Sequence, residues 1–203
     1  LNIAKMKFRW NAGYSLVTRK QPDLRTQQYV KPSGSSIYEM DPDDTRRFWS
    51  DLQDHTVTAS AALTIPYNMF GEKQNFKVGG STIVRFRDFK SRIFRYVETS
   101  QANFNSDLAA LPFDQIFHKE NISQSGFKVE DFTNNQDKYF GISASNSGFA
   151  MFDNKLSEKI RFVWGARIEF FEQYLTTKNQ QSKRIDLNTE TWDLLPSVNL
   201  TWS

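Results

Sequence analysis

The sequence predicts an all-β protein, built as an antiparallel up-and-down meander of about six strands. Several segments alternate strictly between apolar and polar side chains, and the connections between them alternate between short and long. No segment carries the 3.6-residue repeat of a long amphipathic helix. The chain has 203 residues, of which 15% are aromatic, and this is too many rings for a disordered protein.

Four segments carry the clearest alternation. In residues 4–16 the even positions are apolar, from Ala4 to Leu16, and the odd positions are mostly basic or small. Residues 57–67, 160–170 and 192–202 repeat this pattern, so each predicts a strand with two different faces. Two less regular strands are expected over residues 75–96 and 138–152. The first of these is several times longer than an ordinary globular strand.

The connections predict how the strands are arranged. Long connections are expected over residues 18–55 and 99–137, a medium one over residues 176–190, and short turns over residues 68–74 and 153–158. A meander with these links has its short turns at one end and its long loops at the other. Outer-membrane barrels sort their loops in this way, so we interpret residues 1–203 as one partial domain of a larger transmembrane β-barrel.

Composition excludes several classes of function. The 26 basic and 23 acidic residues leave a net charge of only +3, so nucleic acid is not an expected partner. No stretch reaches the roughly 18 to 20 apolar residues of a membrane-spanning helix. The absence of cysteine excludes disulfides, zinc–thiolate sites and a cysteine nucleophile.

Alternation alone does not show which face of a strand meets water. The alternative is therefore a soluble antiparallel β-barrel or sandwich that binds an apolar or glycan ligand. The membrane interpretation is favoured because rings gather near the segment ends and alanines occupy the same face. The side chains expected to face lipid are Phe8, Trp10, Tyr67, Phe162, Trp164, Phe170, Trp192 and Trp202. Those expected to face a lumen, mainly in structural charge pairs, are Arg85, Arg87, Arg161, Arg167 and Glu169.

Several stretches carry a family resemblance. Residues 147–175, SGFAMFDNKLSEKIRFVWGARIEFFEQYL, are similar to a hairpin of TonB-dependent outer-membrane receptors, and LLPSVNLTW at 194–202 resembles the strand that follows there. KQPDLRTQQY at 20–29 and VRFRDFKSRIFRY at 84–96 resemble earlier barrel segments, particularly in receptors of Bacteroidetes-like bacteria. These motifs are loose patterns, strongest over residues 147–202.

The resemblance implies a 22-stranded barrel with an N-terminal plug in the bacterial outer membrane, importing a scarce nutrient such as a metal chelate, glycan or peptide. The partners it implies are outer-membrane lipid, the remaining barrel strands, the plug of the parent chain, and the periplasmic protein TonB acting through that plug region. The chain contains neither a plug nor a TonB-contacting segment, so we interpret it as a piece of a longer receptor that does not transport by itself.

The other candidate sites do not match a known catalytic or metal-binding pattern. Asp41, Asp43 and Asp44 form an acidic cluster, but they lack the glycine and distal glutamate of a calcium-binding EF-hand loop. His55 and His118 are the only imidazoles, and both are expected in loops. We therefore predict no enzyme activity, no catalytic residue, no metal site and no cofactor. Pro112 is expected to begin a short helical turn within the second long loop.

Overall fold

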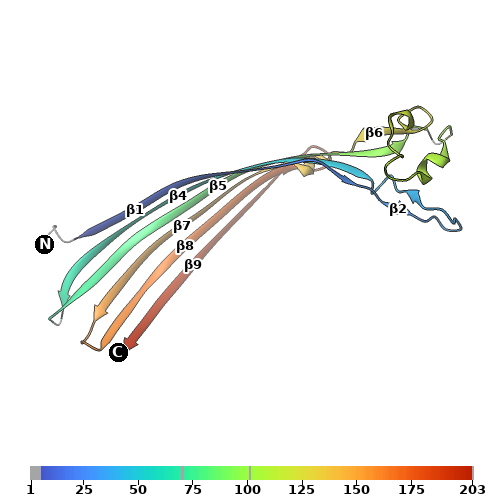
Figure 1. The fold of residues 1–203 in the computed structure, drawn as a ribbon. Coiled ribbons are helices and arrows are strands. Elements are labelled where there is room, and N and C mark those ends of the chain that lie inside the picture. The colour runs from blue at the N-terminus through green and yellow to red at the C-terminus, as the bar shows by residue number, and fades with distance from the viewer. Residues whose placement is uncertain (1–5, 70, 101, 203) are drawn as a thin grey trace.

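The computed structural model describes residues 6–69, 71–100 and 102–202, and it is an all-β protein. Ala4, expected at the start of the first strand, lies outside the described residues. Six long strands lie side by side in one curved sheet, in the order β1-β4-β5-β7-β8-β9, and each pair is antiparallel (Figure 1). The predicted antiparallel meander is therefore confirmed. The long strands are β1 (Lys7–Thr26), β4 (Arg46–Met69), β5 (Glu72–Glu98), β7 (Tyr139–Lys155), β8 (Ile160–Lys178) and β9 (Arg184–Trp202).

The strands are longer than the alternation indicated, so several expected connections are wrong in extent. The connection expected over 18–55 shrinks to 27–45, and the one expected over 176–190 is a turn at 179–183. The missed strand ends carry only scattered apolar side chains, such as Trp49 and Leu187, so they lack a long apolar repeat. Their backbones nevertheless pair, with one register shift between Gln21 and Leu24. His55, expected in a loop, consequently lies within β4.

The remaining turns are close to those expected. The turn after β4 is tighter than the predicted 68–74, and its Gly71 adopts a φ of 79° that favours glycine. Phe70, in the same turn, lies outside the described residues. The turn between β7 and β8 covers residues 156–159 rather than 153–158. Both turns lie at the end of the sheet where β1 begins and β9 ends (Figure 1).

The two long connections meet at the opposite end of the sheet, and we call residues 27–45 and 99–138 together the loop cap (Figure 1). The first contains a small hairpin of β2 (Tyr29–Val30) and β3 (Glu39–Met40). The second contains β6 (Phe127–Asp131), which pairs with the end of β5, and short 3-10 helices at Ser106–Ala110, Lys119–Asn121 and Asn135–Asp137. The helical turn predicted at Pro112 is present, since the Gln115 and Ile116 amides donate to its carbonyl.

The hydrophobic core lies in the loop cap and not under the sheet. Four buried side chains form it, with Ile116 0% and Phe127 1% exposed, joined by Met40 and Tyr96. Tyr96 stacks on Phe117 with ring centroids 3.7 Å apart. Because these residues come from both loops and from β5, the cap is a packed unit anchored to the sheet. Among the described residues, no helix has the length and apolar character needed to cross a membrane.

We predict that Ile116→Ala loosens the loop cap by about 2 to 5 kcal/mol, because it removes a fully buried side chain and leaves a cavity. Hydrogen exchange at amides of residues 102–132 should speed up accordingly, while amides in the middle of β8 keep their protection. Phe113→Ala, at a side chain 69% exposed, is the matched control and should change little. Equal effects of the two substitutions would contradict this core assignment.

Candidate functional site: a two-faced sheet and its loop cap

Cross-strand pairing assigns every side chain of the sheet to one of two faces, since directly opposed residues share a face. One such row runs Trp10, Ala61, Gly80, Gly148, Ile168, Leu194 across all six long strands. The neighbouring row, on the other side, runs Asn11, Ser60, Ser81, Ser147, Glu169, Asp193. We call these the apolar face and the polar face.

The eight residues expected to face lipid all lie on the apolar face by register. Many of its large side chains are exposed, for example Trp10 (72%), Leu194 (70%) and Trp202 (83%). Small residues such as Ala61 and Gly80 occupy its centre, while rings gather toward its margins. Phe152 stacks on Trp164 at 4.6 Å and Phe170 meets Trp192 at 4.4 Å between ring centroids.

The apolar side chains form a band of limited height, which we call the apolar band. It covers residues 57–67 on β4, 76–86 on β5, 142–152 on β7, 160–170 on β8 and 192–202 on β9. From Trp192 to Trp202 the strand advances roughly 33 Å, and a tilt of about 40° gives a height of roughly 25 Å.

The apolar band crosses the strands obliquely. Leu16 ends it on β1, and the register connects Leu16 through His55, Phe86, Ile142 and Tyr174 to Asn188. On β9, however, the band ends at Trp192, four residues further along that strand than Asn188. A band of constant level must run obliquely to the register when the strands themselves are tilted.

The five residues expected to face a lumen all lie on the polar face, and each is in an ion pair. Arg161 makes a two-pronged contact with Asp153, at 2.8 and 2.6 Å, and Arg167 lies 2.6 Å from Glu169. Arg85 and Arg87 both approach Asp54, which is 7% exposed, and Arg87 donates to it. Each of these charges is therefore paired with an opposite charge within the sheet.

A shallow pocket of about 190 Å³ adjoins this last group on the polar face. Arg85 and Arg87 line it together with Ser143 and Gln173. Oδ1 of Asp54 has no hydrogen-bond partner within the described part of the chain, although Nε of Arg85 lies 3.6 Å away. The side chains of Arg85 and Arg87 are 51% and 38% exposed, so both guanidinium groups are accessible to an anionic group in this pocket.

A larger pocket, of about 570 Å³, lies where β1, β4 and β5 enter the loop cap. Asp23 holds two of the arginines that line this pocket, because its carboxylate accepts hydrogen bonds from Arg47 and Arg25. Arg47 and then Arg25 hold the pKa of the Asp23 carboxyl far below its usual range, so it stays ionised. The pocket is lined by arginines, rings and polar groups: Arg25, Thr26, Gln27, Thr45, Arg46, Arg47, Tyr96, Phe113, Asp114, Phe117 and His118.

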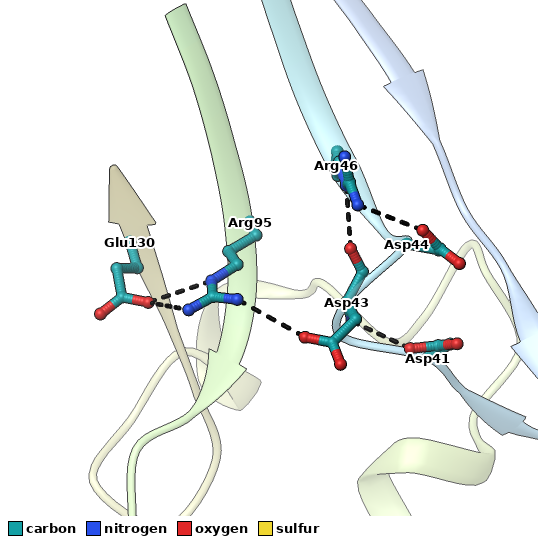
Figure 2. A network of polar contacts seen from close by, with 6 residues as sticks. All are labelled: Asp41, Asp43, Asp44, Arg46, Arg95 and Glu130. Carbon is teal, nitrogen blue, oxygen red and sulfur yellow. Dashed lines mark hydrogen bonds and ion pairs between the residues drawn. The ribbon is translucent and has the colours of Figure 1, made fainter. Parts of the chain in front are cut away.

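The acidic cluster at residues 41–44 turns toward arginines (Figure 2). The Asp43 carboxylate lies 3.5 Å from Arg95, and Asp44 lies 3.2 Å from Arg46. The Asp41 carboxylate accepts the Asp43 amide at 2.9 Å, which makes it part of the turn. Arg95 also donates to Glu130 on β6, so the network links both long loops through β5 (Figure 2). Across residues 6–69, 71–100 and 102–202, no group of His, Asp or Glu side chains has a metal-binding arrangement.

Within the described residues, neither histidine contacts both a carboxylate and a hydroxyl group. His55 Nδ1 lies 2.7 Å from the Tyr14 hydroxyl on the apolar face, and His118 lies 3.4 Å from Glu120 at the surface. Comparison of the chain with protein-family models and with curated proteins finds no match.

We predict that Thr133→Val raises the pKa of Asp131 part of the way from about 2 toward its ordinary 3.8, because the Thr133 hydroxyl is the largest cause of the lowering, whereas Arg92 and the Thr133 amide, the next causes, remain. Since the folded-state pKa is depressed, Asp131 stabilises the β5–β6 pairing above about pH 3.8, and this contribution is lost as the pH falls through about 2. A carbon-13 titration of the Asp131 carboxyl measures this directly. An unchanged pKa in the variant would contradict the assigned cause.

Proposed function

We propose that this chain forms part of the barrel wall of a TonB-dependent receptor in a bacterial outer membrane, which takes up a scarce nutrient into the periplasm. The observation that carries the proposal is the apolar face, which is continuous over six strands and exposed in the described residues. Such a face needs an apolar covering, and a band roughly 25 Å high matches the hydrocarbon that a transmembrane barrel meets.

Three further observations support the same proposal. The band is oblique to the register, as tilted barrel strands require. Its margins are aromatic, which is typical of membrane interfaces. Short turns lie at one end of the sheet and the packed loop cap at the other, the arrangement of outer-membrane barrels. A soluble sandwich would instead cover this face with a second sheet, and the described residues contain no such layer.

In this proposal the polar face lines the lumen and the loop cap faces outward. The pocket of about 570 Å³ and the arginines near Asp54 are then the places where a nutrient first meets the protein. Loops held by a rigid sheet are suited to recognition, because the strands set the position of each contact. The transport step itself requires the plug and the other strands, and we propose no catalytic role for any residue.

We predict that Leu194→Arg blocks membrane insertion of the full-length protein, whereas Leu195→Arg does not. The two leucines are adjacent on β9, at the same level, and lie on the apolar and polar faces respectively. An arginine facing the middle of the bilayer should cost about 2 to 4 kcal/mol, while one facing the lumen remains hydrated. The measurement is the fraction of protein recovered as heat-modifiable, protease-resistant barrel in outer membranes.

The pair of leucines also separates the proposal from the soluble alternative. A sandwich that buries the apolar face would lose soluble yield with Leu194→Arg and never appear in the membrane fraction. Normal membrane insertion of the Leu194→Arg variant, or equal effects of both substitutions on insertion, would contradict the assignment of the apolar face to lipid.

We also predict that nutrient uptake by the full-length receptor depends on the inner-membrane energy-coupling complex. Uptake of labelled metal chelates, glycans and peptides should be compared in cells with an active and an inactivated complex, while binding to the cell surface is measured in parallel. Uptake should stop and binding persist when the complex is inactive. Undiminished uptake would indicate a passive pore and contradict the receptor class.

A further inference from the structure

Beyond the apolar band, the apolar face carries charged side chains. They include a row of cations and, nearer the band, the carboxylates of Asp88, Glu172, Asp186 and Glu190. Lys20 on β1 opposes Asp51 on β4, which opposes Lys90 on β5. At the other side of the sheet Lys178 on β8 opposes Arg184 on β9. Tyr139 pairs with both Phe89 and Thr177, so Lys138, the residue before it, continues the row between Lys90 and Lys178. The cations of this basic row are Lys20, Lys90, Lys138, Lys178 and Arg184.

Two adjoining hollows confirm that the row is continuous in space. One, of about 390 Å³, is lined by Lys20, Lys90 and Lys138 together with Trp49 and other residues. The second, of about 550 Å³, is lined by Lys90 and Lys138 again and also by Lys178 and Arg184. The shared lysines make the two hollows one groove. Lys20 and Lys90 lie four residues beyond the ends of the apolar band on β1 and β5, whereas Lys178 and Arg184 lie eight residues beyond its ends on β8 and β9, so the groove leaves the margin of the band toward β9.

Carboxylates neutralise only part of the basic row. Lys90 lies 2.7 Å from Asp88, Arg184 lies 2.8 Å from Asp186, and Lys20 lies 3.9 Å from Asp51. Within the described residues no ion pair joins Lys138 or Lys178 to a carboxylate. In the register of the row itself, five cations accompany one carboxylate, that of Asp51, while Asp88, Glu172, Asp186 and Glu190 lie nearer the band. The side chains of Lys20 and Lys90 are 75% and 67% exposed.

The level of Lys20, Lys90 and Lys138 suits a lipid headgroup, because each lies four residues beyond the end of the apolar band on its own strand. Lys20 lies four residues beyond Leu16, the end of the apolar band on β1, which at a tilt of about 40° is roughly 10 Å higher. The headgroup layers extend a hydrocarbon core of about 30 Å to a total of about 40 to 45 Å. Flexible lysine stems can lie along apolar surface and direct their ammonium groups toward phosphates at that level.

We propose that the part of the basic row nearest the apolar band, Lys20, Lys90 and Lys138, binds the phosphate-bearing headgroups of outer-leaflet lipids, with the acyl chains of those lipids lying on the band. This inference rests on the proposed function, because it requires the apolar face to meet the bilayer. The occupant is a membrane lipid, since the row is continuous with the band on which an acyl chain would lie. A soluble anion would use the phosphate contacts alone and gain nothing from that continuity.

The test uses the full-length protein reconstituted in phosphatidylcholine vesicles. Spin-labelled phosphatidylglycerol and spin-labelled phosphatidylcholine are added in turn, and the immobilised lipid fraction at the protein surface is measured by electron paramagnetic resonance. We expect the anionic lipid to associate several-fold more strongly than the neutral one. The combined variant Lys20→Gln, Lys90→Gln, Lys138→Gln should lower this preference to near parity, and raised salt should lower it in the unmodified protein.

The matched control is Lys7→Gln, Lys73→Gln, Lys77→Gln, which removes the same charge from the polar face. It should keep the preference for the anionic lipid. If the first variant does not insert, the single Lys138→Gln variant serves in its place and should give a smaller loss in the same direction. Equal losses in the two triple variants would overturn the proposal, because bulk charge and not the basic row would then set the preference.

Two further outcomes separate this inference from the function on which it rests. Normal insertion without any preference for the anionic lipid overturns the headgroup site and leaves the barrel proposal standing, whereas failure of the unmodified protein to insert contradicts both. Inorganic phosphate at constant ionic strength should not displace the anionic lipid. Displacement by phosphate alone would indicate a free-anion site and overturn the assignment to lipid.

Discussion

The antiparallel register, which is continuous through the apolar band, is the constraint on which the rest of the structure depends. Side chains alternate along each strand, so a slip of one residue would move every side chain of that strand to the other face. Among the described strands the register shifts once, between Gln21 and Leu24, above the apolar band. Rows such as Trp10 to Leu194 therefore stay aligned over six strands, and the two faces remain chemically distinct.

The hydrophobic core of the described residues does not lie against the two-faced sheet. The buried apolar cluster lies in the loop cap, around Ile116 and Phe127, while the apolar face of the sheet is exposed. Soluble monomers rarely expose contiguous apolar patches of more than a few hundred Å², because water contact with such a surface is costly. Lipid removes that cost, provided that further strands satisfy the outer backbone groups of β1 and β9, since hydrocarbon cannot. The proposed position in the wall of a larger membrane barrel thus accounts for both features: lipid covers the apolar face, and neighbouring strands pair with the outer edges of β1 and β9.

Sequence reasoning predicted the sheet where one face is apolar and missed it elsewhere. Residues 57–67 and 160–170 alternate visibly, so their strands and faces were predicted correctly. Residues 46–56 and 184–190 pair just as fully, but their few apolar side chains, such as Trp49, Ile185 and Leu187, form no sustained repeat on one face. The core around Ile116 depends on contacts between two loops and β5, which no local pattern encodes. The basic row could have been found by continuing the even parity of β1 and β5 to Lys20 and Lys90.

The central claim is that the apolar face meets lipid while the polar face meets water. Single cysteines placed along residues 192–202 of β9, each carrying a spin label in the membrane-inserted full-length protein, report this directly through their accessibility to oxygen and to a water-soluble nickel complex. We predict maxima for oxygen at even positions such as Leu194 and Val198, and maxima for the nickel complex at odd positions such as Leu195 and Asn199. Even positions that are closed to both reagents, or open to the nickel complex as fully as the odd ones, would contradict the claim.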